Sequence, residues 1–266
     1  MGSPDRSVTV IIPARFGSTR FAGKPLAMLV GKPLIQHVYE RAQTSPGVHR
    51  VIVATDDARI AAAVNGFHGT AVLTSKPYRT GTDRVAAVAR EIPGQVFVDL
   101  QSDEIALHPE LITDLVMPFL ASRAGMGTLK RRLTAEEDLR NPSVVKVVTD
   151  SLGDALYFSR APVPCVRDGQ PGSPRPGLHY LHLGIYIYTR EILMRLADLP
   201  SGPLEEAEQL EQLRALEHGI PIRVWETAHH SLRVDTPEDL REAEAALVGL
   251  MSGAQVEAKA EAGRKN

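Results

Sequence analysis

The chain has 266 residues, enough for one large α/β domain or two small ones with a substantial core. Its single cysteine, Cys165, excludes an intrachain disulfide and a multi-cysteine metal cluster. With 30 Lys and Arg against 32 Asp and Glu, the charge is −2, which shows neither the basic excess of a nucleic-acid binder nor the acidic excess of a disordered chain. No apolar run reaches the roughly 18 residues of a membrane span, and the first residues lack a signal-peptide core. We therefore expect a cytoplasmic globular protein that binds neither membrane nor nucleic acid.

Apolar runs alternate with helical patterns along the first 140 residues. Three runs are typical of buried strands, and each ends in a polar cluster. They are Val8–Ile12, Val51–Ala54 and Gln95–Leu100. Helical patterns over 34–42 and 58–65 follow the first two runs. This alternation predicts βαβ units and a parallel sheet, which binds ligands at the carboxyl ends of its strands.

The pattern changes from about Asn141. Residues 144–149 and 155–159 predict a hairpin, and the segment 162–177, rich in Pro and Gly, predicts a mobile loop. A strand over Leu183–Tyr188 is followed by a predicted helix over Leu204–Glu217. Thr236 and Pro237 have the residue types of a helix cap and a first helical position.

The segment Pro13–Pro25, between the first strand and the first helix, has the composition of a phosphate-binding loop. It contains two glycines, two hydroxyl side chains, two arginines and a lysine, which suits a polyphosphate. It is not a Walker loop, because Pro25 stands where a magnesium-binding Ser or Thr is needed, and it does not match GxGxxG. By composition alone, an ordinary polar loop stays the alternative.

A series of motifs runs along the chain from residue 8 to residue 245. The motifs include Ile12–Arg15, Gly23–Leu26, Gly81–Arg84, Gln101–Glu104, Ala155–Arg160, His182–Tyr186, Leu210–Arg214 and Val234–Leu240. In this order they resemble those of the CMP-Kdo synthetases, the 3-deoxy-manno-octulosonate cytidylyltransferases. The resemblance implies a nucleotide-diphospho-sugar-transferase-like, Rossmann-like α/β fold with a mixed, mostly parallel sheet and flanking helices. It implies one domain over 1–250, with a CTP-binding half at 8–140, an acceptor and dimerisation half at 141–245, and a disordered tail at 251–266. CTP, magnesium and a homodimer are expected.

The resemblance assigns the residues that handle CTP. It implies that Asp103 and Asp235 hold magnesium, an ion that takes hard oxygen ligands and keeps several waters. Together with Lys24 and Arg15, which would neutralise the triphosphate, they form the implied catalytic set. Without the family, either aspartate is better explained as a cap or a turn residue. The implied nucleotide-binding residues are Pro13, Ala14, Arg15, Ser18, Arg20, Lys24, Arg79 and Thr80.

The second half is implied to bind a small acidic acceptor. Without the family, Tyr186 would be read as a core residue, Glu211 as a solvated one and His182 as a satisfied core histidine. The remaining histidines, including His229 and His230, lack a third ligand at metal spacing, so a zinc site is not expected. The implied acceptor-binding residues are Gln101, Arg167, His182, Tyr186, Glu211, Gln212 and Arg233.

Several residues depart from the family pattern. Ser102 replaces a glycine, Leu181 a basic residue and Arg233 a glycine, while Phe21–Ala22 replaces a Leu-Pro pair. Most of these changes fall where acceptor and metal would meet, and arginine is suited to bidentate binding of a phosphonate or a carboxylate. The nucleotide is therefore better specified than the acceptor.

The sequence predicts a CTP-dependent cytidylyltransferase that attaches CMP to an acidic acceptor and releases pyrophosphate. The acceptor is 3-deoxy-manno-octulosonate or a similar sugar acid, or alternatively a small phosphonate such as phosphonoformate. A non-catalytic nucleotide-binding homologue is the hypothesis from another class. The retained Lys24, Asp103 and Asp235 argue against it, whereas Ser102 beside a metal ligand keeps it open.

Overall fold

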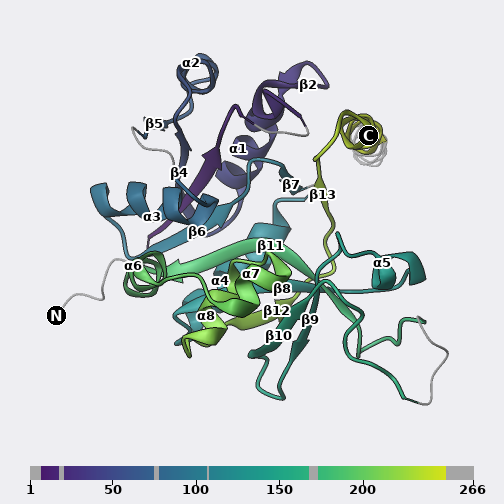
Figure 1. Ribbon diagram of the computed structural model, residues 1–266. Coiled ribbons are helices and arrows are strands. Elements are labelled where there is room, and N and C mark those ends of the chain that lie inside the picture. Colours follow the sequence, from purple (N-terminus) through teal and green to yellow (C-terminus); the bar gives the residue numbers. More distant parts are fainter. Residues whose placement is uncertain (1–6, 18–20, 75–77, 107, 168–172, 250–266) are drawn as a thin grey trace, which may run out of the picture.

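The computed structural model describes residues 7–17, 21–74, 78–106, 108–167 and 173–249. A nine-stranded sheet lies at its centre, with helices on both faces (Figure 1). The strand order is β10-β9-β11-β6-β1-β4-β5. Strand β8 lies off this path and pairs with both β11 and β12. Both halves of the chain contribute strands to this one sheet. The predicted α/β class is therefore confirmed.

The elements of the first half include the parallel strands β1, β4, β5 and β6 and the helices between them. In chain order they are β1 (Val8–Ala14), η1 (Lys24–Leu26), β2 (Met28–Leu29), β3 (Lys32–Pro33), α1 (Leu34–Thr44), β4 (Val48–Thr55), α2 (Ala58–Gly66), β5 (Ala71–Leu73), α3 (Gly81–Glu91), β6 (Val96–Leu100), β7 (Glu104–Ala106), α4 (Glu110–Ala121), β8 (Met126–Arg132) and α5 (Glu136–Arg140).

The elements of the second half complete the sheet and cover part of it. They are β9 (Lys146–Thr149), β10 (Ala155–Ser159), β11 (Tyr180–Thr189), α6 (Arg190–Asp198), α7 (Pro203–Glu208), α8 (Gln212–Glu217), β12 (Arg223–Glu226) and β13 (Ser231–Arg233). A final helix covers residues 237–249. The predicted tail, 251–266, lies outside the described residues.

Strand β1 is parallel to both β4 and β6, as predicted from the apolar runs. Its alternate residues Val10 and Ile12 belong to one core cluster and Ile11 to the other, so both faces of the strand are buried. Because the three strands run in the same direction, their carboxyl ends meet at one edge of the sheet. The polar residues that follow Ala14, Thr55 and Leu100 are brought together there.

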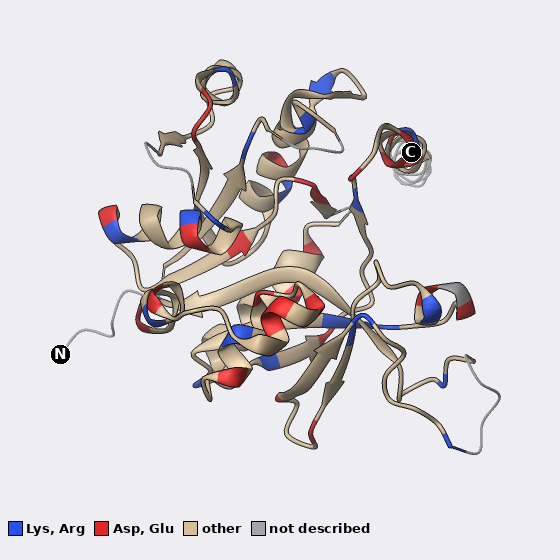
Figure 2. Cartoon of the chain, viewed as in Figure 1, with Lys and Arg blue, Asp and Glu red and all other residues tan. Residues whose placement is uncertain are grey.

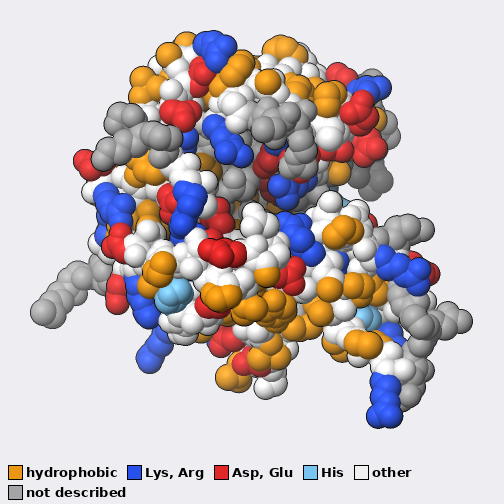
Figure 3. Space-filling model, in the orientation of Figure 1, with side chains coloured by type: hydrophobic (Ala, Val, Ile, Leu, Met, Phe, Trp, Pro, Cys, Tyr) orange, Lys and Arg blue, Asp and Glu red, His pale blue; other side chains and the backbone are white. Residues whose placement is uncertain are grey.

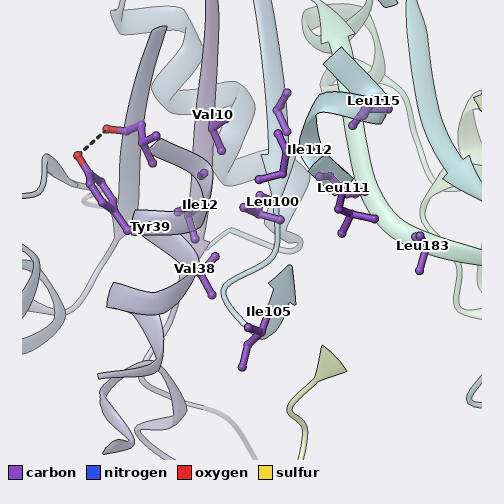
Figure 4. Close-up of a cluster of buried hydrophobic side chains, with 14 of the residues drawn as sticks. Val10, Ile12, Val38, Tyr39, Leu100, Ile105, Leu111, Ile112, Leu115 and Leu183 are labelled. Carbon is purple, nitrogen blue, oxygen red and sulfur yellow. Dashed lines mark hydrogen bonds between the residues drawn. The ribbon is translucent and has the colours of Figure 1, made fainter. Parts of the chain in front are cut away.

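Two apolar clusters hold the helices against the sheet. Figure 4 shows the first, in which Val38 of α1 and Leu115 of α4 lie on either side of the strand residues Ile12 and Leu100. At its edge the Tyr39 hydroxyl donates to the Val51 carbonyl oxygen at 3.3 Å. The second cluster packs α3, α6 and α8 on the opposite face. The sheet is thus enclosed on both sides, which gives the loops at its edge a rigid support.

The second half adds antiparallel pairing. Strand β11 is antiparallel to β6, and β9 and β10 form the predicted hairpin. The described parts of 162–177 contain no helix or strand. No helix among the described residues is both long enough and apolar enough to cross a membrane.

The prediction of one helix over Leu204–Glu217 was wrong. The chain forms two short helices, α7 and α8, with Gln209 between them at φ 52°. The Arg160 guanidinium binds the carbonyl oxygens of Glu208 and Gln209 at 2.7 and 3.2 Å, so these acceptors are not available to a continuous helix. A tertiary contact therefore overrides a good local helix propensity.

Candidate active site

The loop after β1 turns sharply before Lys24. Gly23 has a φ of 71°, and its N–H donates to the Phe16 carbonyl oxygen at 2.9 Å. A Cβ on Gly23 would lie 3.0 Å from the Phe16 ring, so both the backbone conformation and the space favour glycine. The turn closes the loop and starts η1 at Lys24. Residues 18–20 lie outside the described part, and with them the predicted Ser18 and Arg20.

The Lys24 ammonium lies between two carboxylates. Its Nζ is 2.6 Å from Asp103 Oδ2 and 3.2 Å from Asp235 Oδ1. The three side chains are only 10%, 16% and 19% exposed, respectively. In such a setting the attraction between the charges is screened much less than at the surface. The structure thus brings together the lysine and both aspartates that the resemblance assigned to catalysis.

A short antiparallel pair joins the segments that carry the two aspartates. Strand β13 pairs with β7 with Arg233 opposite Glu104, and the Val234 N–H donates to the Asp103 carbonyl oxygen at 3.0 Å. Figure 2 shows acidic and basic residues facing one another at this pair. Asp103 precedes one strand and Asp235 follows the other, so the antiparallel pairing places them side by side.

The helix over 237–249 supports Asp235 from its N-terminus. The Asp239 carboxylate accepts hydrogen bonds from the backbone N–H groups of Asp235 and Thr236, both at 2.8 Å. The Thr236 hydroxyl in turn accepts from the Asp239 N–H at 3.2 Å. This reciprocal arrangement is a capping box. The predicted capping role of Thr236 is confirmed, and the cap holds the backbone of Asp235 in position.

The two aspartates fit a magnesium ion. Their oxygens converge on one cation, the Lys24 ammonium, and carboxylate oxygens are the hard ligands that magnesium takes. Among the described residues, no three His, Cys, Asp or Glu side chains gather at metal-binding distance. The protein therefore offers two ligands, and magnesium commonly takes the remainder from water and substrate phosphates.

A cavity of about 280 Å³ opens at the carboxyl ends of β1 and β6. Most of the predicted nucleotide-binding residues lie in its wall, together with both aspartates. Arg84, at the back of the wall, donates to Asp56 Oδ2 at 2.7 Å and to Thr74 Oγ1 at 2.8 Å. The lining residues are Pro13, Ala14, Arg15, Lys24, Pro25, Tyr78, Arg79, Thr80, Gly81, Arg84, Gln101, Ser102, Asp103, Glu211, Arg233 and Asp235.

A second cavity, of about 460 Å³, adjoins the first. Four residues line both: Gln101, Asp103, Glu211 and Arg233. Most of the predicted acceptor-binding residues line the second cavity. Figure 3 shows basic and acidic side chains together across the middle of the molecule. Asp103 thus stands at the junction of the two cavities, with Asp235 in the wall of the first, an arrangement that suits transfer of a group between two substrates.

The comparison with known families decides the class of the protein. The model of the cytidylyltransferase family matches residues 9–224, which is most of the chain. The chain belongs to the cytidylyltransferase family. The predicted resemblance, the fold and the nucleotidyltransferase class of enzyme are thereby confirmed.

Curated cytidylyltransferases are similar along nearly the whole chain. The 3-deoxy-manno-octulosonate cytidylyltransferase of Geobacter sulfurreducens is 52% identical over 241 residues, 88% of this chain and 96% of that protein. The protein with the same name from an Anaeromyxobacter species is 53% identical over 244 residues, 91% of this chain and 97% of that protein.

Solved structures agree with these relatives. A CMP:2-keto-3-deoxy-manno-octonic acid synthetase complexed with CTP superposes with a TM-score of 0.85 at 39% identity, covering 91% of this chain and 99% of that one. The inositol-1-phosphate CTP transferase of T. maritima has a TM-score of 0.66 at 14% identity, covering 91% and 96%. The second likeness shows a shared fold.

Some predicted residues of this cytidylyltransferase lie at the margin of the site. Arg167 is exposed and lines neither of the two cavities. Arg79 lines the first cavity, but its guanidinium is directed to Ser201 Oγ at 2.8 Å and to Asp83 Oδ2 at 3.8 Å. The structure therefore gives Arg167 no contact that supports its predicted role.

His182 and Tyr186 lie together on β11, in the wall of the second cavity. Burial lowers the pKa of His182 to about 3, so its imidazole is neutral at physiological pH. Its Nε2 lies 3.0 Å from Thr128 Oγ1, and that hydroxyl is also 2.7 Å from the Ile185 carbonyl oxygen. Burial also raises the pKa of Tyr186 well above its usual value. Both side chains are therefore neutral at physiological pH.

Sequence reasoning missed two arginines of the second cavity, Arg131 and Arg160. Arg131 Nε is buried with no hydrogen-bond partner, and so is the amide nitrogen of the predicted Gln212. Arg131 lies at the end of strand β8, and the sequence pattern did not distinguish it from a surface residue. Arg160, by contrast, has its guanidinium bound to backbone carbonyl oxygens. Among the described residues, Arg131 and Gln212 thus each bring a buried donor without a partner to this wall.

Three of the residues that depart from the family pattern lie in these walls, whereas Phe21 and Ala22 line neither cavity. Ser102 lines the first cavity, Leu181 the second and Arg233 both. The Arg233 Nε is 3.2 Å from Asp235 Oδ2, so Asp235 binds a second cation besides Lys24. The departures are therefore concentrated around the junction, as their positions in the sequence predicted.

A buried polar network lies behind the junction. Thr82 Oγ1 is 2.7 Å from Glu211 Oε2 and 3.2 Å from Asp99 Oδ2, and Gln101 Nε2 donates to Asp99 Oδ1 at 2.8 Å. The break between α7 and α8 places Glu211 here, immediately before α8. Sequence reasoning predicted Gln101 and Glu211 but missed Asp99 and Thr82, because both read as ordinary residues of a strand and a helix.

Proposed function

We propose that the protein transfers CMP from CTP to 3-deoxy-manno-octulosonate and releases pyrophosphate. The observation that carries the proposal is the junction, where Asp103 lies in the walls of two adjoining cavities. The relatives that share about half of the sequence are named for this acceptor. The solved relative superposed above holds CTP.

The first cavity would receive the nucleotide. The acceptor oxygen would attack the α-phosphorus of CTP in line, and the bond to the β-phosphate would break as pyrophosphate leaves. Such a transfer depends chiefly on positioning and on neutralising the charge of the phosphoryl group. Arg15, Lys24 and Arg84 place three cations in the cavity wall. Lys24 is best placed for the reacting phosphate because its ammonium contacts Asp103, which lines both cavities.

We propose magnesium as the cofactor, with Asp103 and Asp235 as its protein ligands. When bound, it would supply positive charge at the reacting oxygens. The same carboxylate oxygens now bind the Lys24 ammonium, so the ion and the lysine would compete for them. Arg233 on Asp235 adds a further competitor in this chain.

The second cavity would bind the acceptor. A sugar acid presents hydroxyl groups and one carboxylate, and the wall offers matching groups. Arg131 and Gln212 carry the unused donors, whereas Glu211 and Gln101 can accept hydrogen bonds from hydroxyl groups at the junction. With 3-deoxy-manno-octulosonate, the nucleophile would be the anomeric hydroxyl beside the carboxylate.

We further propose that the protein forms a homodimer through the region of the β9–β10 hairpin. Leu152, Leu156 and Leu178 are 72%, 63% and 42% exposed. Hydrophobic side chains also gather on the lower part of the face in Figure 3. Strand β10 is an edge of the sheet, and such edges are commonly covered in native proteins. Light scattering should give twice the monomer mass for the wild type and a lower mass for Leu156→Lys.

A pyrophosphate-release assay tests the reaction. CTP and magnesium would be supplied with 3-deoxy-manno-octulosonate, sialic acid or phosphonoformate in parallel, and CTP would be replaced by UTP or ATP as controls. We expect turnover with CTP and 3-deoxy-manno-octulosonate. A preference for phosphonoformate would replace the proposed acceptor. Binding of CTP without turnover of any of the three would overturn the proposal.

A further inference from the structure

Asp99 is a carboxyl group buried without a countercharge. It is 0% exposed, and no lysine or arginine among the described residues forms an ion pair with it. Both of its oxygens have neutral partners, the Thr82 hydroxyl and the Gln101 amide. An isolated buried carboxylate is strongly unfavourable, and such a group commonly stays protonated instead.

The hydrogen bonds of Thr82 are consistent with a protonated Asp99. The Thr82 hydroxyl has one proton but lies near two carboxyl groups, 2.7 Å from Glu211 Oε2 and 3.2 Å from Asp99 Oδ2. If Thr82 donates to the nearer Glu211, its oxygen can only accept from Asp99, which must then carry the proton. The hydrogen bonds then run in one direction: Asp99 donates to Thr82, and Thr82 donates to Glu211.

Asp99 also sets the orientation of Gln101. Its Oδ1 accepts from Gln101 Nε2 at 2.8 Å, so the amide oxygen of Gln101 is the group left to face a substrate. The Gln101 amide is also confined by Gly81, because a Cβ on Gly81 would lie 3.1 Å from both Nε2 and Oε1 of Gln101. Asp99 thus contacts, directly or through Thr82, two residues that line both cavities.

We propose that Asp99 is a positioning residue for the acceptor and acts in its protonated form, as a donor to Thr82 and an acceptor from Gln101. The proposal rests on the proposed function. In this state Thr82 stabilises an ionised Glu211, and Gln101 presents its amide oxygen at the junction. Loss of the proton would place a second negative charge beside Glu211 and leave Thr82 between two competing acceptors. Binding of the acceptor would then weaken.

The surroundings of the network agree with this assignment. Burial, and then the charge of Glu211, raises the pKa of Asp99 to about 8. The other titratable groups that face it are Tyr186 and Tyr188 of β11, and burial raises the pKa of both well above 10.0. Glu211 is faced by Asp83 of α3 and by Arg214 of α8, whose charge opposes the rise that burial causes in the pKa of Glu211. With a pKa of about 8, Asp99 is a group of this network whose ionisation changes between pH 7 and pH 9.

The test compares the pH dependence of KM for the acceptor in the wild type and in Asp99→Asn. Asparagine has nearly the same shape and reproduces both hydrogen bonds of the protonated carboxyl. We expect the wild-type KM to rise roughly tenfold from pH 7 to pH 9, because only about a tenth of the molecules would keep the proton one unit above the pKa. Asp99→Asn should keep the pH 7 value and show no such rise. Asp99→Asn with the same alkaline rise would overturn the proposal.

Two further measurements separate this proposal from the proposed function. Thr82→Val removes the hydroxyl that links the two carboxyl groups, and we expect a raised acceptor KM at pH 7 with little change in CTP affinity. Infrared spectroscopy should detect a protonated carboxyl near neutral pH that disappears in Asp99→Asn. Failure of every acceptor to react would refute the proposed function, whereas absence of this band would refute the protonated Asp99.

Discussion

The Lys24 ammonium and the Asp103 carboxylate are separated by 79 positions in the chain and by 2.6 Å in the structure. This ion pair joins the loop after β1 to the turn after β6, and Asp235 adds a third segment at 3.2 Å. The site is therefore held together by the same charges that would handle substrate.

Lys24→Met should lower kcat/KM for pyrophosphate release by about 100- to 1,000-fold, the usual cost of removing one group that stabilises charge in a transition state. It should also lower the midpoint of thermal unfolding, because Asp103 and Asp235 would lose the cation that lies between them, while Arg233 would remain on Asp235. Lys32→Met is the matched control, since Lys32 pairs with Glu40 at the surface, where the two side chains are 44% and 40% exposed. Equal effects of both substitutions on turnover would contradict a role for Lys24.

Asp235→Asn should reduce turnover by at least about 100-fold and weaken the response to added magnesium, because one hard charged ligand becomes a neutral amide. CTP binding in the absence of magnesium should change little. Kinetics at several magnesium concentrations, together with calorimetric titration of CTP, would separate these effects. Glu238→Gln serves as the control, because its ion pair with Arg241 is exposed. An unaltered magnesium dependence would exclude Asp235 as a ligand.

Asp239→Ala should lower the free energy of unfolding by about 1 kcal/mol, the typical value of a helix cap. The carboxylate accepts two backbone hydrogen bonds, and one of these holds the N–H of Asp235. We therefore expect kcat to fall as well, although Asp239 lines neither of the two described cavities. Urea denaturation and steady-state kinetics would measure the two effects. A loss of stability with unchanged kcat would limit Asp239 to capping.

Asp99 should make stability fall as pH rises. Its pKa is raised from 3.8 in the unfolded chain to about 8 in the folded protein, so the folded state binds the proton more tightly between these values. The stabilisation that the Asp99 proton contributes is complete below pH 4 and is lost as pH rises through 8. Over this range the free energy of unfolding falls by at most about 1.4 kcal/mol per pH unit. Denaturation of the wild type and of Asp99→Asn from pH 4 to pH 9 would measure this difference. Parallel curves would show that Asp99 is already ionised at low pH.

Local patterns were sufficient for much of the fold. The apolar runs at β1, β4 and β6 predicted buried parallel strands because both faces of each run are apolar. The hairpin of β9 and β10 and the cap at Thr236 followed from residue types within a few positions of one another. The prediction of one helix over Leu204–Glu217 was wrong because the break between α7 and α8 depends on Arg160, which is distant in sequence.

The sequence by itself determined the family and the α/β class and predicted residues for CTP and magnesium, because these depend on residue types in a fixed order along the chain. Only the tertiary structure decided that Lys24 lies between Asp103 and Asp235, and that Asp99 is buried without a cation. The strength of an ion pair and the protonation of a carboxyl group depend on which charges lie nearby and on how much water is excluded. Both depend on contacts between segments far apart in the chain, which a linear pattern does not contain.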